Sequence, residues 1–403
     1  MRRLLGRLGW IIAGVVVLAA AGIAIALWVS RPPEAGAFYD PPELAADTAP
    51  GTLLRSERMD AGVPEGAEGW RILYATPGLD GEPRAVSGQV IARPGGDDPR
   101  SALAWAHGTI GVARGCAPTL MDDPSIVMLR PLGPVLAEGW VVVATDYPGL
   151  GTPGPHPYLA GEVTGRSVID SVRAAGQIDD LGGLDGRYAV WGESQGGHAA
   201  LWTGIVAAQG YAPELELVGV AAAAPASDIG PLFEAAIGTK PGKILISEAA
   251  WAWDRAYPEL SFEEAIRPAA RPAARVIAER CLFPNIAVVA ATTLAVPDNM
   301  LAIDIVSDPR WSRRITESTP DGAIDVPVVI AQGDRDPVVA PAVQRAWVRE
   351  RCAAGQSIDF REVPGAGHAD VLGRVGDDLV GWTRDRFAGV AAAAGCPGLP
   401  ASG

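Results

Sequence analysis

The chain has 403 residues, 48% of them hydrophobic, and a formal net charge of −14 at pH 7. This apolar content supports a large packed core and argues against disorder. With this excess of negative charge, the sequence has no run of basic residues that could neutralise phosphates. This argues against nucleic acid as a partner. The length allows two or three average domains, or one large α/β domain with an insertion.

The N-terminus carries a long apolar segment. Three arginines within the first seven residues precede an uncharged run over residues 8–29. A run of about 20 apolar residues can span a bilayer, and the preceding positive charges place the N-terminus in the cytoplasm. Residues 1–30 are therefore predicted to be a signal anchor or a cleaved signal peptide. The length of the run, with Trp10 and Trp28 at its ends, favours the uncleaved anchor, in which residues 8–29 contact the membrane.

Either form of this segment places the main domain outside the cytoplasm. Residues 31–50, rich in proline and alanine, are predicted to be a linker. The four cysteines fit an oxidising compartment, because an even number in an exported chain predicts two disulfides with three possible pairings. No C-x-x-C motif or Cys/His cluster indicates a metal site. The cysteines are Cys116, Cys281, Cys352 and Cys396.

From about residue 51 the pattern alternates between apolar strands and helices. Strands are expected at 70–76, 85–93, 101–107, 140–145, 188–192, 217–224, 326–331 and 357–363. Helices are expected at about 131–138, 165–180, 196–209, 341–353 and 370–389. Strands that are apolar throughout and alternate with helices predict a mostly parallel sheet with helices on both faces.

The pentad Gly192-Glu193-Ser194-Gln195-Gly196 follows one of these strands and begins a helix. A G-x-S-x-G pentad in that context is typical of a nucleophile elbow. The turn is so sharp that only glycine fits two residues before and two after the serine. A chance match in a glycine-rich chain is the alternative, which the flanking strand and helix oppose. Ser194 is therefore the predicted nucleophile, at the positive end of the following helix.

About a hundred residues without a clear strand follow the next strand, between residues 224 and 326, a length too great for a loop in a compact sheet. We expect residues 229–322 to form a helical lid over an apolar acyl pocket. The alternative is a peripheral domain unrelated to catalysis. The hydrolase core would then comprise residues 51–228 and 323–396.

A serine nucleophile needs a base, and the chain has only four histidines. His368 lies in a glycine-rich turn after the last predicted strand, which gives the chain order Ser…Asp…His, so it is the predicted base. His107 ends a strand and fits an oxyanion loop. His156 lies in a proline-rich loop, and His198, four residues after Ser194, should point away from the hydroxyl.

Two aspartates compete to orient this histidine, since both follow the strand at 326–331. Asp336 is predicted to face His368, and Asp334 to cap the turn. The developing oxyanion also needs donors. We expect the backbone N–H groups of Gln195 and Thr109 to supply them, with Gly108 as the alternative to Thr109.

Several segments together resemble the secretory lipase family of the α/β-hydrolase superfamily. They are Ala106–Thr109, Cys116–Thr119, Thr145–Leu159, Gly165–Asp170, the elbow, Gly333–Asp336 and Gly367–His368. The resemblance implies an α/β-hydrolase fold with a helical lid inserted after the nucleophile-following strand, hydrolysis of acyl esters, and no cofactor. It also implies the pairings Cys116–Cys281 and Cys352–Cys396. The anchor-like N-terminus and the His-Gly-Thr oxyanion loop differ from the fungal members and favour a bacterial branch.

The leading functional prediction is a serine carboxylic ester hydrolase, a lipase or esterase of lipid catabolism. It would cleave lipid or small-molecule esters through an acyl-enzyme on Ser194. One alternative is an acyltransferase that uses the same triad with an alcohol acceptor. Another is a non-catalytic binding protein of the cell envelope, which the complete Ser, Asp and His set opposes.

Overall fold

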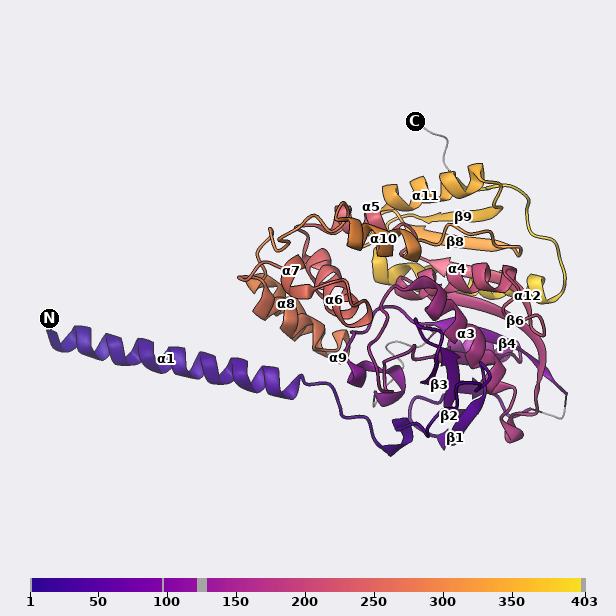
Figure 1. Cartoon of the computed structure of the whole chain (residues 1–403), viewed down its shortest axis with the longest axis horizontal. Coiled ribbons are helices and arrows are strands. Elements are labelled where there is room, and N and C mark those ends of the chain that lie inside the picture. Colours follow the sequence, from indigo (N-terminus) through magenta and orange to yellow (C-terminus); the bar gives the residue numbers. More distant parts are fainter. Residues whose placement is uncertain (1, 96–97, 122–128, 400–403) are drawn as a thin grey trace.

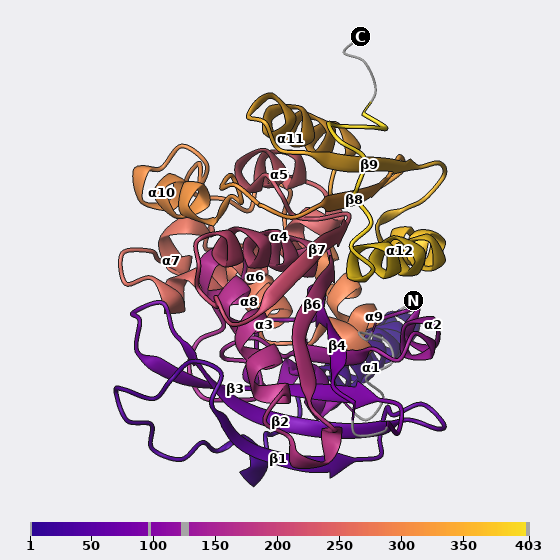
Figure 2. The same cartoon turned by 90° about the vertical axis from the view of Figure 1, so that its right-hand side faces the viewer.

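The computed structural model of the chain describes residues 2–95, 98–121 and 129–399. Its described residues build a nine-stranded sheet in the order β1-β2-β3-β5-β4-β6-β7-β8-β9. The strands β1 to β3 and β5 pair antiparallel, whereas the pairs from β5 through β9 are parallel. Figure 2 shows β1 to β3 at one end of the sheet and β8 and β9 at the other. The bounds are β1 Leu53–Met59, β2 Glu68–Pro77, β3 Pro83–Ala92, β4 Arg100–Ala106, β5 Val141–Thr145, β6 Leu184–Glu193, β7 Glu216–Ala223, β8 Val328–Gly333 and β9 Ile358–Val363.

Helices cover both faces of this sheet, which confirms the predicted fold class. Their bounds are α2 Leu132–Ala137, α3 Gly161–Ala175, α4 Gln195–Ala208, α11 Pro341–Ala353 and α12 Val371–Phe387. Successive residues of β5 show why the strands are apolar throughout. Val143 packs in the cluster that contains residues of α3, α4 and α11, and Val142 packs in the cluster with residues of α2 and α12. Alternate side chains of a strand point to opposite faces, and here both faces are buried.

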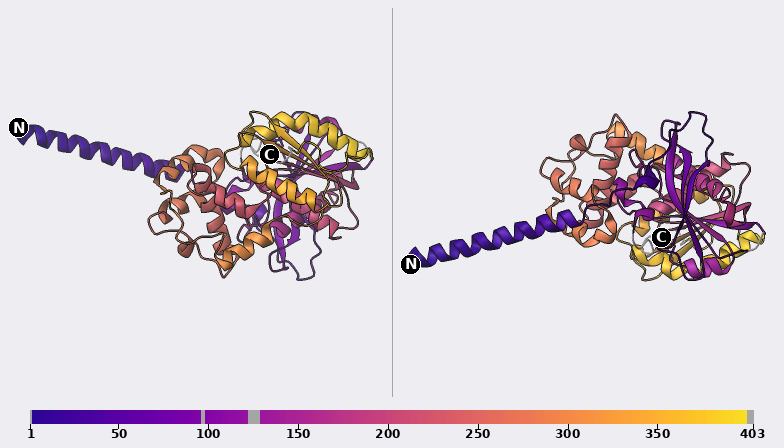
Figure 3. Two further views of the ribbon diagram at one scale, coloured as in Figure 1. Left: turned by 90° about the horizontal axis from the view of Figure 1, so that it is seen from above. Right: turned by 90° about the horizontal axis from the view of Figure 1, so that it is seen from below.

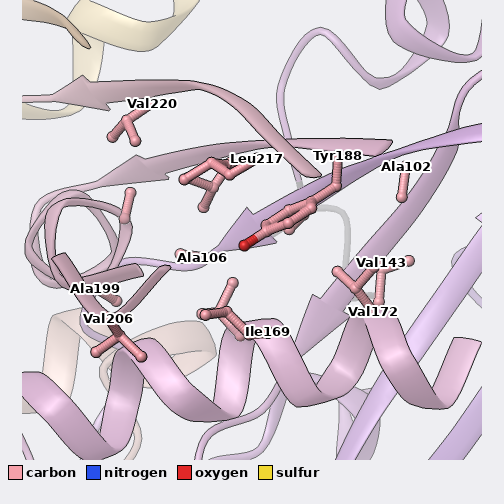
Figure 4. Packing of buried hydrophobic residues seen from close by; sticks show 14 of the residues in the cluster. Ala102, Ala106, Val143, Ile169, Val172, Tyr188, Ala199, Val206, Leu217 and Val220 are labelled. Carbon is pink, nitrogen blue, oxygen red and sulfur yellow. The ribbon is translucent and has the colours of Figure 1, made fainter. Parts of the chain in front are cut away.

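Figure 4 shows the first of these two clusters at close range. Tyr188 of β6 and Val143 of β5 face Ile169 and Val172 of α3. All four side chains are at most 2% exposed. This packing fixes the carboxyl ends of the central strands, where the candidate site lies.

One strand, β1, was not expected from the sequence. It lies at the edge of the sheet, pairs only with β2, and three of its seven residues are exposed. Such an edge strand needs no continuous apolar run, because only part of it faces the core. The charged residues Arg55, Glu57 and Arg58 therefore interrupt the apolar pattern by which a strand is recognised in a sequence.

The chain between β7 and β8 is helical and contains α5 to α10. Their bounds are α5 Ile229–Ala236, α6 Lys240–Ala256, α7 Phe262–Ala265, α8 Arg271–Ala278, α9 Leu282–Thr292 and α10 Pro309–Ser318. These helices bury a cluster of their own, in which the Trp253 ring lies 5.8 Å from that of Trp311 and 6.0 Å from that of Phe233. Helices α6 to α9 lie together on one side of the sheet (Figure 1).

Helix α1 (Arg2–Val29) projects away from the rest of the molecule (Figures 1 and 3). Its end contacts the helical insertion, where the Arg280 guanidinium donates to the Leu27 carbonyl at 3.0 Å and to the Ser30 hydroxyl at 3.1 Å. Over the residues searched, which are those that the structure describes, no helix is both long enough and apolar enough to cross a membrane. The membrane span predicted at residues 8–29 is therefore not supported.

Two disulfides, Cys116–Cys281 and Cys352–Cys396, use all four cysteines of the chain. They are the pairings that the family resemblance implies. The first joins the loop after β4 to the residue that precedes α9, across 165 positions of sequence. The second joins α11 to the C-terminal segment.

Candidate active site

The predicted elbow is a tight turn between β6 and α4. Ser194 has φ 57° and ψ −117°, a strained conformation for a residue with a side chain. A Cβ on Gly192 would lie 1.9 Å from the carbonyl oxygen of Gly196, and one on Gly196 would lie 1.9 Å from that of Ala106. Both positions therefore require glycine. A side chain at Gly192 would collide with the beginning of helix α4, and one at Gly196 would collide with the end of the neighbouring strand β4.

The structure brings together the three residues that the sequence selects. His368, in the turn after β9, places its Nε2 atom 2.9 Å from the Ser194 hydroxyl. Its Nδ1 atom lies 2.8 Å from Oδ2 of Asp336. The carboxylate of Asp336 accepts a hydrogen bond from Nδ1–H, which leaves Nε2 without a proton and able to accept a hydrogen bond from the serine hydroxyl.

Asp336 is held in place from several sides. Its side chain is fully buried. Its Oδ1 atom accepts hydrogen bonds from the backbone N–H groups of Val338 and Val339, at 2.8 and 2.9 Å. The Gln332 amide donates to Oδ2 at 3.1 Å. Asp334 is exposed, and accepts from the N–H of Gly365, which places it on the turn that carries the histidine.

The predicted oxyanion residues face the same cavity as Ser194 and His368. Gln195 begins α4, and Thr109 follows β4 by three residues. A Cβ on Gly108 would lie 3.7 Å from the Cβ of Ser194, so this loop runs beside the nucleophile. The Thr109 hydroxyl is 2.8 Å from the hydroxyl of Tyr158. The use of the Gln195 and Thr109 N–H groups stays a prediction.

His156 contacts the elbow, which the sequence did not reveal. Its Nδ1 atom lies 2.9 Å from the Pro148 carbonyl, so Nδ1 carries the proton. Its Nε2 atom then accepts from the side-chain amide of Gln195 at 3.2 Å. Burial lowers the pKa of His156 to about 4, which keeps the ring neutral. The contact joins residues 39 positions apart and leaves no periodic signal.

The other two histidines hydrogen bond elsewhere. His107 places Nδ1 2.7 Å from the Gly108 carbonyl, beside the predicted oxyanion loop. His198 places Nε2 2.7 Å from the Ser318 carbonyl, away from Ser194 as expected. Burial lowers the pKa of both rings to about 4. Both are therefore neutral parts of the core near neutral pH.

A cavity of about 690 Å³ lies above Ser194 and His368. Most of its walls are apolar, and about half of the residues that line it come from the helical insertion, with Ile244 of α6 and Ile286 of α9 among them. Polar groups on the wall include Tyr158 and Glu248. The arrangement offers a nucleophile with its base at the floor of an apolar chamber.

Comparisons with known proteins identify the family of the chain. A family model described as secretory lipase matches residues 124–395. A secreted triacylglycerol lipase of Malassezia globosa is 26% identical, over 97% of this chain and 89% of its own length. A protein of Mycobacterium tuberculosis, named a probable inactive lipase, is 26% identical over 92% of this chain and 88% of its own.

The fold is also shared with solved structures. Candida antarctica lipase A superposes with a TM-score of 0.74 at 21% identity, covering 89% of this chain and 87% of that one. A rice cell wall degrading esterase of Xanthomonas oryzae superposes with a TM-score of 0.66, also at 21% identity, covering 84% and 98%. Since the family model spans more than half of the sequence, the chain belongs to the secretory lipase family.

Proposed function

We propose that the protein hydrolyses carboxylic esters with apolar chains through an acyl-enzyme on Ser194. The observation that carries this proposal is the hydrogen-bonded series Ser194–His368–Asp336 at the floor of an apolar cavity. A serine hydroxyl is a weak nucleophile until a base takes its proton. The base here is within hydrogen-bonding distance, and a buried carboxylate fixes its orientation.

The reaction follows from this geometry in two halves. The Ser194 Oγ attacks the ester carbonyl carbon while its proton passes to Nε2 of His368, and the Asp336 carboxylate stabilises the imidazolium. The N–H groups of Gln195 and Thr109 would donate to the oxyanion. His368 returns the proton to the leaving alcohol. Water then attacks the acyl-enzyme by the same path, which releases the acid and restores the serine.

The helical insertion acts in this proposal as the lid. Helices α6 and α9 give the cavity its apolar wall, which suits the acyl chain of a lipid ester. A role in lipid degradation outside the cytoplasm is consistent with the relatives named secreted lipases.

The test must detect chemistry at Ser194 itself, because one relative is named an inactive lipase. A p-nitrophenyl alkylphosphonate should react once, when Oγ displaces p-nitrophenolate from phosphorus. We expect a burst of about one equivalent of p-nitrophenol and a matching mass increase on the proteolytic peptide that contains Ser194. Rates on p-nitrophenyl esters from acetate to palmitate should then give the chain-length preference. Absence of both the adduct and ester hydrolysis would contradict the proposal.

The contact between His156 and Gln195 gives a prediction about positioning. Replacing either residue by leucine removes one partner of a buried hydrogen bond beside the elbow. We expect each variant to lose about tenfold in kcat, with KM little changed, because the start of α4 is then less well fixed. The double variant should lose no more than about either single variant. Fully additive losses would show that the two residues act independently.

A further inference from the structure

Glu248 lies on the face of α6 that lines the cavity. The residues of α6 on this wall include Pro241, Ile244, Leu245 and Glu248, whose spacing of three to four positions marks one side of a helix. The other three of these are apolar. Glu248 is only 1% exposed, so it is not a surface residue that happens to border the opening.

The carboxyl of Glu248 is buried without a partner. Among the described residues, neither of its oxygen atoms has a hydrogen bond. An unpaired buried polar group is destabilising, so native proteins rarely keep one without a reason. Burial raises the pKa of Glu248 to about 8, so the group is protonated near pH 7. It then offers one O–H donor and one carbonyl acceptor.

Four charged or titratable groups that lie near Glu248 or line the same cavity have partners of their own or lie in solvent. The Lys243 ammonium pairs with Asp298 at 2.8 Å. The Tyr158 hydroxyl bonds Thr109 at 2.8 Å. Lys240, at the beginning of α6, is exposed. His368, across the same cavity, bonds Ser194 and Asp336.

We propose that the Glu248 carboxyl is a substrate-binding subsite, which takes esters whose chain carries a hydroxyl group within the cavity. The inference rests on the proposed function and narrows its substrate class. A hydroxyl provides one donor and one acceptor, and so satisfies both oxygen atoms of a carboxylic acid. A ketone or ether satisfies only the donor. A plain hydrocarbon chain leaves both oxygen atoms unpaired in the bound complex.

Tyr158 indicates where along the chain the hydroxyl should lie. The proximity of Glu248 contributes, after burial, to the raised pKa of Tyr158. Tyr158 in turn bonds Thr109, on the loop beside Ser194. Glu248 therefore lies toward the oxyanion side of the cavity, which favours a hydroxyl close to the ester group.

The experiment compares matched pairs of esters in two panels. One panel holds p-nitrophenyl hexanoate and its analogues with a hydroxyl at each of carbons 3 to 6. The other panel holds butyl hexanoate and the monohexanoates of butanediols. Its hydrolysis is measured by the release of hexanoic acid. We expect at least one hydroxylated ester to exceed its unsubstituted partner about tenfold in kcat/KM. In Glu248→Leu this ratio should fall by about 10- to 100-fold.

The variants separate recognition from folding. Glu248→Leu should raise Tm, because it removes an unpaired polar group from an apolar wall. Glu248→Met is the second apolar variant, and Glu248→Gln should keep most of the preference because an amide also has donor and acceptor. Ser247→Ala, on the same helix but bonded to the Lys243 carbonyl, is the control that should leave the ratio unchanged.

Two results would overturn the subsite. One is a wild-type protein that hydrolyses unsubstituted esters but prefers no hydroxylated ester in either panel. The other is a preference that survives in folded Glu248→Leu and Glu248→Met. A wild-type protein without hydrolysis of any ester would instead overturn the proposed function itself, and the subsite with it.

Discussion

Replacement of Ser194 by alanine is expected to lower kcat for p-nitrophenyl ester hydrolysis by about 10⁶-fold. The variant lacks the oxygen that lies 2.9 Å from Nε2 of His368, so no acyl-enzyme can form. KM should change little, because the apolar walls of the cavity stay intact. Initial rates and the phosphonate adduct measure the two consequences directly, and circular dichroism reports folding.

The matched control for this variant is Ser171→Ala. Ser171 is a buried serine of α3 whose hydroxyl bonds the Val168 carbonyl within the helix. We expect the Ser171→Ala variant to keep its activity within about threefold of the wild type, since the hydroxyl that it loses is bonded within a helix of the sheet core. Substantial ester hydrolysis by purified Ser194→Ala would show that another residue is the nucleophile.

Asp336→Asn should lower kcat by about 10⁴-fold, the second largest effect. Oδ2 of Asp336 accepts from Nδ1 of His368, and Oδ1 already accepts from two backbone N–H groups. An asparagine must turn its oxygen toward those backbone groups, so its NH₂ group faces the histidine. That group favours the tautomer with the proton on Nε2, which cannot take the proton of Ser194.

Asp334→Asn tests the assignment with nearly the same sequence change. Asp334 is exposed and accepts from the Gly365 N–H, a bond that an asparagine oxygen can also accept. We expect its kcat to stay within about threefold of the wild type. If Asp334→Asn loses activity and Asp336→Asn keeps it, the two roles are reversed. Profiles of kcat against pH for both variants would show which one alters the ionisation of the base.

The sequence predicted the parts of the fold that have a local signature. The strand that leads to Ser194 is buried on both faces, so its apolar run is continuous and easy to recognise. The elbow was equally clear, since the collisions at Gly192 and Gly196 show that the backbone there admits no side chain. Chain order then selected His368 and Asp336, which the structure places within 2.8 Å of one another.

The sequence could not predict features that depend on the tertiary surroundings. The sequence did not predict β1, because an edge strand tolerates charged residues. The contact of His156 with the elbow was not predicted, because its partner, Gln195, becomes a neighbour only when the proline-rich loop folds onto the elbow. Glu248 would be taken for a solvent-facing residue of an amphipathic helix, since nothing in the neighbouring sequence shows that this face of α6 lines a cavity.

The Cys116–Cys281 bond determines which end of α9 can move. Cys281 immediately precedes α9, and the next N–H, that of Leu282, donates to the Ile110 carbonyl at 2.8 Å. The amino end of α9 is thus fastened to the loop that carries Thr109. A movement of α9 relative to this joint would take place through Phe283 and Asn285, whose backbone angles are not helical, with the largest travel toward Thr292. The apolar wall that α9 gives the cavity would then shift while the loop that carries Thr109 stays in place.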